Sequence, residues 1–228
     1  MSEAEKIKQR YAKRAADPSV QTRDTNQKYG DYIKAERQAI YSNICRDKFK
    51  DLSAVELIEI GAGSGGNLLF FKSIGLLWKN IYANELLEDR IEVLKGKLDR
   101  EATIDSGDAL RLDYKAKFDI VFQSTVFTSV LDTSFKIELA NKMKEMVKED
   151  GILLWYDFKY DNPNNQDVKG INKREIESLF RGFSSFEYYN VTLLPPLGRR
   201  IGNLYNFVNS LFPFLKTHLI CVISNPEN

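Results

Sequence analysis

Three acidic residues stand at the ends of three short apolar runs, where their carboxylates could bind one ligand together. Glu59 and Glu85 each close a run, and Asp108 follows the third. A carboxylate at the first position would repel a pyrophosphate but suits an amine or sulfonium cation. The second acid can accept hydrogen bonds from two ribose hydroxyls, and the third from an exocyclic adenine amine. The acids therefore predict a pocket for adenosine joined to a cation, rather than for a dinucleotide.

A glycine-rich segment at residues 59–67, with the sequence EIGAGSGGN, follows the first apolar run and opens a helix. Glycines there allow a tight turn and let the backbone approach a nucleotide-type ligand closely. Gly61, Gly63 and Gly66 also satisfy the dinucleotide pattern G-x-G-x-x-G. An NAD-dependent oxidoreductase is therefore one alternative, although it predicts an apolar residue where Glu59 stands. A non-catalytic cofactor-binding module is another, but it has no need of all three acids.

The composition is that of an ordinary soluble globular protein. The 228 residues are 43% hydrophobic and 29% charged, which suits one α/β domain with a sizeable core. Lys and Arg number 33 and Asp and Glu 32, so the net charge of +1 lacks the basic footprint of general nucleic-acid binders. We expect no nucleic-acid partner. No apolar run approaches the ~20 residues of a membrane-spanning helix, and the charged N-terminus lacks a signal peptide, so we expect a cytoplasmic protein.

Short apolar runs alternate with amphipathic segments from residue 54 onward. Strands are expected at 54–60, 79–84, 102–105, 118–123 and 151–158. Helical segments at 86–98 and 134–148 lie between them, and this alternation predicts a parallel sheet with helices on both faces. Further along the chain we expect a helix near 172–181, a strand at 185–194, a helical insertion near 199–214 and a final strand at 218–224. The last two strands, joined without a full crossover, predict an antiparallel pair at the edge of the sheet.

Five segments resemble the class I S-adenosylmethionine-dependent methyltransferases, in family order and with family-like spacing. They are ELIEIGAGSGG, NIYANELLEDRIEVLK, TIDSGDALRL, FDIVFQSTVF and DGILLWYDF. The resemblance covers residues 54–158 and, weakly, the terminal strand pair. It implies a Rossmann-like α/β sheet of seven strands with the last strand antiparallel, and S-adenosylmethionine as the cofactor. The cofactor-binding residues that we expect are Glu59, Gly61, Ala62, Gly63, Gly65, Asn67, Glu85, Leu86, Gly107, Asp108, Ala109 and Gln123.

The N-terminal part of the chain differs in pattern from the remainder. Residues 1–50 are rich in polar and charged residues, and we expect two helices there, at 3–16 and 31–47. In the family that the sequence resembles, such a leader often closes over the cofactor. We therefore divide the chain into an N-terminal helical extension at residues 1–50, acting as a cofactor lid, and a methyltransferase domain at residues 51–228.

The acceptor of the methyl group must bind beyond the carboxyl ends of the parallel strands. The fourth-strand loop reads QSTV, unlike the N-P-P-aromatic sequence that grips a nucleobase amine, which disfavours base N-methylation. No cysteine lies in a loop of this wall, which disfavours the cysteine-dependent methylation of pyrimidine carbon. The acids that could form part of a metal-assisted site, Asp157 and Asp161, lie on one loop and lack a partner on a second, so we expect no metal. Transfer to a hydroxyl is left, and it needs a group that removes the hydroxyl proton.

Two residues are candidates for that base. His218 is the only histidine and begins the final strand, which starts on the acceptor side if it runs antiparallel. Asp157, at the end of the fifth strand, could act as base or orient the acceptor hydroxyl. Three cations are expected to bind an anionic part of the acceptor: Lys159, Arg199 and Arg200.

The second half of the chain resembles bacterial methyltransferases found with surface-polysaccharide assembly. WYDFKYDNPNNQDVKGINKREIESLF, LPPLGRR and KTHLI carry this resemblance. It implies O-methylation of a sugar hydroxyl, on a glycan or on a nucleotide-linked or lipid-linked saccharide. A small-molecule or protein acceptor is the alternative. The apolar face expected at 199–214 is interpreted as core packing, a dimer surface, a lid or a peripheral membrane contact.

Overall fold

A seven-stranded sheet forms the centre of the protein. The computed structural model describes residues 1–17, 27–163 and 165–225. The strand order is β3-β2-β1-β4-β5-β7-β6, and β7 runs antiparallel to both of its neighbours while the remaining pairs are parallel. The strands are β1 (Leu57–Ile60), β2 (Ile81–Glu85), β3 (Thr103–Ser106), β4 (Phe118–Ser124), β5 (Val147–Phe158), β6 (Ser185–Leu193) and β7 (Lys216–Ser224). The predicted sheet, with its antiparallel last strand and edge pair, is confirmed.

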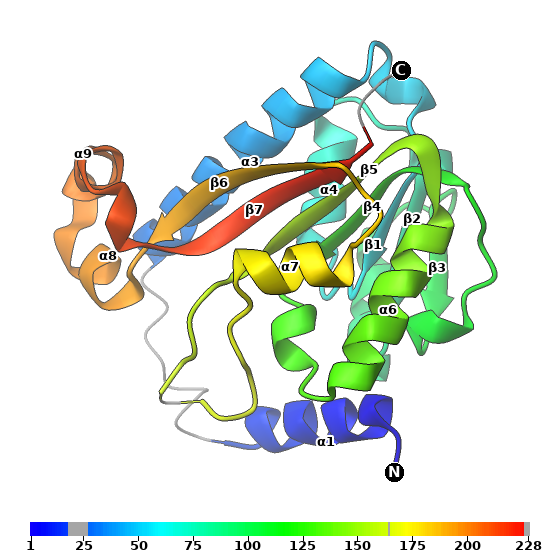
Figure 1. Cartoon of the computed structure of the whole chain (residues 1–228), viewed down its shortest axis with the longest axis horizontal. Helices are drawn as coiled ribbons and strands as arrows, with labels where there is room; N and C mark the ends of the chain where they lie inside the picture. The colour runs from blue at the N-terminus through cyan, green and yellow to red at the C-terminus, as the bar shows by residue number, and fades with distance from the viewer. Residues whose placement is uncertain (18–26, 164, 226–228) are drawn as a thin grey trace.

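The described part of the chain has eight α-helices, most of which pack against the sheet (Figure 1). They are α1 (Glu3–Ala15), α3 (Gln27–Lys48), α4 (Gly66–Ser73), α5 (Glu88–Lys97), α6 (Thr133–Met146), α7 (Lys173–Leu179), α8 (Pro195–Ile201) and α9 (Tyr205–Leu211). Several begin at side chains that satisfy free backbone N–H groups. Ser2 and Glu5 form a capping box at α1, Asp132 caps α6, and Asn172 caps α7. In the described ranges, no helix is long and apolar enough to cross a membrane.

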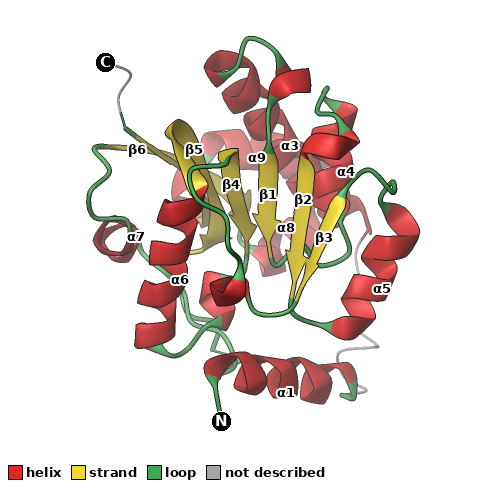
Figure 2. Cartoon of the chain, turned by 90° about the vertical axis from the view of Figure 1, so that its right-hand side faces the viewer, coloured by secondary structure: helices red, strands yellow, loops and turns green. Residues whose placement is uncertain are grey.

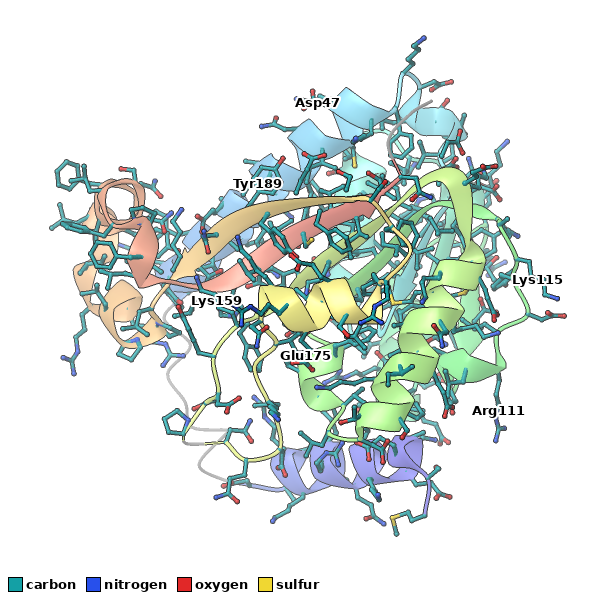
Figure 3. The ribbon with its side chains drawn as sticks, viewed as in Figure 1. Asp47, Arg111, Lys115, Lys159, Glu175 and Tyr189 are labelled. Carbon is teal, nitrogen blue, oxygen red and sulfur yellow. The ribbon has the colours of Figure 1, made fainter. Side chains whose placement is uncertain are left out.

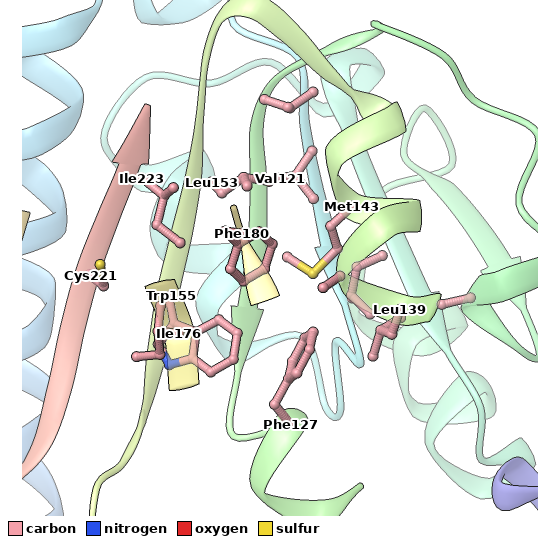
Figure 4. Close-up of a cluster of buried hydrophobic side chains, with 14 of the residues drawn as sticks. Val121, Phe127, Leu139, Met143, Leu153, Trp155, Ile176, Phe180, Cys221 and Ile223 are labelled. Carbon is pink, nitrogen blue, oxygen red and sulfur yellow. The ribbon is translucent and has the colours of Figure 1, made fainter. Parts of the chain in front are cut away.

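Buried apolar side chains pack on both faces of the sheet. On one face, α6 and α7 cover a cluster in which the Phe127 and Trp155 rings lie 4.5 Å apart and Phe180 packs edge-on to Trp155 (Figure 4). On the other face, α3, α4 and α5 cover a second cluster that includes Tyr41 and Phe71. Helix α3 therefore contributes to the same core as the strands, because Tyr41 is 1% exposed and contacts β-strand residues directly.

Two segments lie outside these layers. Helix α1 crosses beyond the carboxyl ends of β1, β2 and β3, as Figure 2 shows. Helices α8 and α9 form a lobe that projects from the end of the β6–β7 pair (Figure 1). The lobe packs against the first turns of α3 through a small cluster around Tyr29, Leu193 and Tyr205.

The predicted insertion at 199–214 is the clearest difference between expectation and structure. It is two short helices rather than one, because Gly202 has a φ of 50° and interrupts the helical path. The first helix also starts earlier, at Pro195, since proline lacks the N–H that the first turn leaves free. Helix α3 begins four residues before the predicted 31–47, and β1 is shorter than 54–60 because 52–54 forms a 3-10 turn capped by Asp51.

Candidate functional site

A cavity of about 350 Å³ opens beyond the carboxyl ends of β1, β2 and β4. This volume is at the lower end of the range for small-molecule sites. Ten of the twelve residues predicted to bind a cofactor share its wall: Glu59, Gly61, Ala62, Gly63, Asn67, Glu85, Leu86, Gly107, Asp108 and Ala109. The structure therefore brings together most of the residues that the sequence analysis singled out.

The path of the glycine loop depends on two glycines that have no side chain, Gly61 and Gly63. Gly61 has a φ of 67°, and a Cβ added there would lie 2.5 Å from Cγ2 of Val126. Gly63, with a φ of 58°, exposes its N–H toward β2, where it donates a 2.7 Å hydrogen bond to Oε2 of Glu85. The first glycine thus permits a close approach between two loops, and the second presents its amide to an acid.

Glu85 connects the glycine loop to the start of α5. Its Oε2 accepts from Gly63, and its Oε1 accepts from the backbone amides of Leu86 and Leu87 at 2.8 and 2.9 Å. Four lone-pair positions serve three protein donors, so the carboxylate retains capacity to accept from a ligand hydroxyl. Glu85 is 3% exposed and lines the cavity. It therefore both connects two loops by hydrogen bonds and is a candidate ligand-binding group.

The loop after β3 is held in place by neighbouring polar side chains. Asn84 donates to the carbonyl oxygens of Asp105 and Gly107, each at 3.1 Å. Asp108 accepts from the amide of Leu110 at 3.0 Å through its Oδ1 and begins a 3-10 turn. These bonds fix Asp108 at the wall of the cavity, where its carboxylate can accept from an amine.

Glu59 and Arg37 line one end of the cavity, and each keeps a buried polar atom without a partner among the described residues. Asn67 donates to Oε1 of Glu59 at 2.6 Å, but Oε2 has no partner, and neither has Nε of Arg37. The Arg37 guanidinium lies 4.5 Å above the Tyr156 ring. Burial raises the pKa of Glu59 to about 8, although the Asn67 bond and the Arg37 charge oppose this shift.

Orphaned buried polar atoms are rare in folded proteins and call for an explanation. A bound group that donates to Glu59 and accepts from Arg37 would satisfy both atoms. An ammonium and a carboxylate on one carbon have this pairing. The end of the cavity at Glu59 and Arg37 therefore suits the amino-acid end of a ligand.

Sequence reasoning did not identify Arg37 as part of the site. It lies on α3 four residues after Ile33 and four before Tyr41, in the stripe of the helix that faces the core. The sequence feature that could have identified Arg37 is a cationic residue within an apolar stripe, because a charged residue is seldom buried without a partner. The local sequence does not show that this turn of α3 reaches the cavity.

Helix α1 covers the open side of the cavity with Ala4, Ile7 and Tyr11. Three side chains of α1 bind the loop after β4. Glu3 accepts a hydrogen bond from the Leu131 amide at 3.1 Å. Arg10 donates to the Ser129 carbonyl at 2.9 Å, and the hydroxyls of Tyr11 and Ser129 lie 3.2 Å apart. On the opposite rim, the Arg90 guanidinium lies 4.6 Å above the Tyr11 ring. Helix α1 therefore bridges two sides of the cavity.

Comparison with known protein families identifies the central part of the chain. Residues 58–155, which contain β1 to β5 and most of the cavity wall, match the family model described as a methyltransferase domain. The match spans less than half of the chain and supports a methyltransferase domain in these residues. No curated protein sequence is significantly similar to the chain.

Solved structures with the same fold include several methyltransferases. An S-adenosylmethionine-dependent methyltransferase from Archaeoglobus fulgidus is 16% identical, with a TM-score of 0.55 over 82% of this chain and 93% of that one. The 1,6-didemethyltoxoflavin N1-methyltransferase of Burkholderia thailandensis, solved with S-adenosylhomocysteine, is 14% identical, with a TM-score of 0.60 over 93% and 92%. A putative O-methyltransferase from Nostoc punctiforme is 15% identical, with a TM-score of 0.58 over 84% and 56%.

These comparisons establish a class I methyltransferase fold and support S-adenosylmethionine as the cofactor. They do not distinguish among acceptor atoms, because N-methyltransferases and a putative O-methyltransferase share the fold. The acceptor must be argued from the residues that line the cavity and surround it.

Two residues predicted to bind the cofactor lie beside the cavity rather than on its wall. Gly65, with a φ of 76°, begins α4, and a Cβ there would meet Leu94 of α5 at 3.0 Å. Gln123 is fully buried, donates to the Tyr156 carbonyl at 3.3 Å and accepts from the Val126 amide at 3.0 Å. Both residues hold neighbouring segments in position.

Asp157, a predicted base, is fully buried at the end of β5 and does not line the cavity. The Thr128 hydroxyl donates to it at 2.6 Å, and the amides of Thr128 and Phe158 donate at 3.2 and 3.1 Å. Burial raises the pKa of Asp157 to about 7, against the opposing effect of these hydrogen bonds and of Lys136. Asp157 therefore links β5 to the turn Phe127–Ser129, whose last residue lines the cavity.

His218, the other predicted base, lies opposite Phe158 at the carboxyl end of β5, as an antiparallel last strand requires. It does not line the cavity, because its ring stacks on Tyr156, with centroids 5.3 Å apart, and Arg37 lies above the same tyrosine. Burial and the charges of Arg37 and Lys159 lower the pKa of His218 to about 4. The imidazole is therefore neutral at pH 7, but it is a weak base.

The three predicted acceptor-binding cations also lie outside the cavity wall. Lys159 donates to Oδ1 of Asn190 at 2.8 Å beside the β6–β7 pair (Figure 3), and burial lowers its pKa. Arg199 and Arg200 are exposed on α8, with the Arg199 guanidinium 5.9 Å from the Tyr29 ring centre. In the described ranges, no three His, Cys, Asp or Glu side chains are grouped so that they could hold a metal ion.

Proposed function

We propose that the protein transfers the methyl group of S-adenosylmethionine to a hydroxyl group of a saccharide. The observation that carries the cofactor assignment is the pair of unpartnered buried atoms, Oε2 of Glu59 and Nε of Arg37, at one end of the cavity. When bound, the cofactor supplies an activated methyl group on a sulfonium. The residues of this chain bind the cofactor, exclude water and orient the acceptor.

Each end of the cofactor has a matching group on the wall. Glu59 would accept from the amino group, and Arg37 would donate to the carboxylate. Glu85 would accept from the ribose hydroxyls, while Asp108 would accept from the adenine amine. Gln123 and Gly65 act indirectly in this proposal, by positioning the loop after β4 and the start of α4.

Neutral hydroxyl groups gather at the part of the wall that follows β4. Ser124, Thr125, Ser129 and Tyr11 line this part of the cavity. Side chains of this kind can both donate to and accept from an uncharged, polyhydroxylated acceptor. The resemblance of the second half of the chain to polysaccharide methyltransferases supports the same acceptor class. Residues 1–50 serve as a cofactor lid in this proposal, with α1 as the part that lies over the cavity.

Asp157 is the better of the two predicted bases. A pKa of about 7 keeps a large fraction of the carboxyl ionised at neutral pH and still makes it an effective proton acceptor. A proton would reach it through the Thr128 hydroxyl, which donates directly to Asp157; Thr128 is itself buried and directly precedes Ser129, which lines the cavity. His218 is second, because a pKa of about 4 leaves its imidazole with little affinity for a proton.

Calorimetric titration tests the cofactor assignment. The purified chain is titrated with S-adenosylmethionine, S-adenosylhomocysteine and NAD. We expect saturable binding of the first two and none of NAD. Glu85→Gln should raise the Kd of S-adenosylmethionine and of S-adenosylhomocysteine by about tenfold or more, because a hydrogen bond to a charged group contributes ~1.5–3 kcal/mol. Glu88→Gln is the control, since Glu88 is exposed three residues further along. Binding of NAD alone would contradict the proposal.

Transfer of a labelled methyl group tests the acceptor class. Saccharides, amines, small phenols and a peptide pool are each incubated with the protein and methyl-labelled S-adenosylmethionine. We expect label on saccharides, in an ether that resists mild base. Label on an amine or on a peptide, with none on saccharides, would retain the methyltransferase and reject the saccharide acceptor.

A further inference from the structure

The lobe formed by residues 194–216 exposes a concentration of large apolar side chains that the proposed reaction does not use. Six of the thirteen large apolar side chains exposed among the described residues lie in this segment of the chain. They are Leu194, Leu204, Phe207, Leu211, Phe212 and Phe214. Phe207 is 63% and Phe214 73% exposed, which is unusual for phenylalanine. Figure 3 shows side chains of this lobe projecting away from the rest of the protein.

The same stretch of sequence lacks negative charge. No Asp or Glu occurs between Tyr188 and Pro226, although these residue types account for 32 of the 228 residues. The lobe carries three cations, of which Arg199 and Arg200 are exposed. The third, Lys216, forms a 3.0 Å ion pair with Glu36 of α3. A segment with exposed apolar side chains, two exposed arginines and no acids of its own is complementary to a surface that is apolar within and negatively charged at its boundary.

We propose that the α8–α9 lobe docks on an anionic lipid bilayer. The apolar side chains of α9 and of the segment after it would enter the boundary between headgroups and acyl chains, and Arg199 and Arg200 would bind lipid phosphates. Each helix of the lobe has only seven residues. The contact is therefore interfacial and reversible. It gives the two arginines a role outside the cavity, in place of the acceptor binding that the sequence predicts.

The lobe is held rigidly enough to orient the whole protein on such a surface. Glu36 accepts from the Thr192 amide at 2.9 Å, from Asn209 at 2.8 Å and from Lys216 at 3.0 Å, which joins α3 to both ends of the lobe. Arg37, the next residue, lines the cavity. One turn of α3 thus connects the docking surface to the candidate site, so docking would keep the cavity close to the bilayer.

Co-sedimentation with lipid vesicles tests this proposal. The full chain is mixed with vesicles of equal parts phosphatidylglycerol and phosphatidylcholine, or with pure phosphatidylcholine. We expect binding to the anionic vesicles that is at least about tenfold tighter, since each arginine near such a surface contributes ~1 kcal/mol. Added salt should weaken this difference. Failure of the wild-type protein to bind the anionic vesicles overturns the proposal.

Matched variants locate the contact. Phe207→Ser with Phe214→Ser should lower the affinity for anionic vesicles by about tenfold or more, because the variant no longer transfers two large apolar side chains from water into the bilayer. Val93→Ser with Ile137→Ser removes two exposed apolar side chains elsewhere, on α5 and α6, and should bind like the wild type. Arg199→Gln with Arg200→Gln should lose the preference for anionic lipid. Equal loss in the control pair, or none in the phenylalanine pair, contradicts docking through the lobe.

Sedimentation velocity without lipid separates membrane docking from self-association. A wild-type dimer that the Phe207→Ser, Phe214→Ser variant converts to a monomer, with no vesicle binding, would mean that a second copy covers the lobe, and the proposal would be wrong. Calorimetric titration with S-adenosylmethionine provides the second readout. The phenylalanine variant should bind the cofactor like the wild type, so failure of docking and failure of the proposed function are distinguishable.

Discussion

The Arg37 guanidinium lies 4.5 Å above the ring of Tyr156, with its Nε buried and unpartnered. The ring holds the cation by its π-face and offers no acceptor for the guanidinium N–H groups. Arg37 is thereby kept in place while its hydrogen-bonding capacity stays available at the end of the cavity. This arrangement leads to the first prediction about cofactor recognition.

Replacing Arg37 should weaken binding of the amino-acid end of the cofactor and leave binding of its nucleoside end intact. We expect Arg37→Gln to raise the Kd of S-adenosylmethionine by about tenfold or more, because a charge-assisted hydrogen bond is lost. The Kd of methylthioadenosine, which lacks the amino-acid group, should not change. Arg46→Gln, at an exposed position on the same helix, is the control. An equal loss for both ligands would indicate a structural role for Arg37.

Cofactor binding should become tighter as the pH rises toward the pKa of Glu59. Because burial raises this pKa to about 8, the carboxyl is largely protonated at pH 6, and binding of an ammonium group favours its ionised form. We expect the Kd to fall by up to about tenfold per pH unit from pH 6 and to level off above pH 8. Calorimetric titration with S-adenosylmethionine at several pH values across this range measures the change in Kd.

Glu59→Gln supplies the test of that pH dependence. The variant should bind more weakly and show no change in affinity from pH 6 to 8 that the Glu88→Gln control does not show. If the wild type and Glu59→Gln had parallel pH profiles, another group would be responsible for the titration.

Asp157 should affect both stability and turnover. Its pKa is raised to about 7 in the folded protein, whereas an unfolded aspartate titrates near 3.8. The folded state therefore binds more protons between these values, and this group's contribution to the free energy of unfolding falls as the pH rises from about 4 to about 7. Asp157→Asn should flatten that decline and cost ~1–3 kcal/mol, because asparagine replaces one of the two oxygens that accept from the Thr128 hydroxyl and amide with an NH2 donor. Chemical denaturation at several pH values measures both effects.

A role for Asp157 as base adds a kinetic expectation. Asp157→Asn should reduce kcat by about 100-fold and remove the rise in kcat near pH 7, while KM for the cofactor stays within a few-fold of the wild type. Thr128→Val should reproduce most of the kinetic loss, since the hydroxyl is the proposed path of the proton. Normal kcat in a destabilised Asp157→Asn protein would leave Asp157 with a structural role only.

Gly61 should tolerate no side chain while Val126 is present. Gly61→Ala places a Cβ 2.5 Å from Cγ2 of Val126 and requires a φ of 67°, so we expect cofactor affinity to fall by at least about tenfold. Val126→Ala in the same protein removes the clash and should restore part of that affinity. Gly96→Ala, which meets nothing within 4 Å on α5, should instead stabilise by ~0.5–1 kcal/mol. Thermal melts and calorimetry test the series, and absence of rescue would contradict the steric explanation.

The sequence by itself was sufficient for the fold class and for one wall of the candidate site. Glu59, the glycine loop, Glu85 and Asp108 lie at ends of apolar runs, and in a parallel sheet those ends meet at one edge whatever the rest of the chain does. The antiparallel direction of β7 likewise brings its first residues to the carboxyl end of β5, as the sequence analysis expected, and His218 lies there opposite Phe158. These properties depend on local pattern and on the geometry common to all such sheets.

Only the tertiary structure decided which side chains complete the cavity. Arg37 reaches it, and His218 does not, because Tyr156 lies between α3 and β7 and stacks with the imidazole while Arg37 covers the tyrosine. The burial of Asp157 depends on the turn at Thr128, 29 residues earlier in the chain. Such contacts join residues that are distant in sequence, and burial, pKa and access are set by all the groups packed around a side chain rather than by its neighbours along the chain.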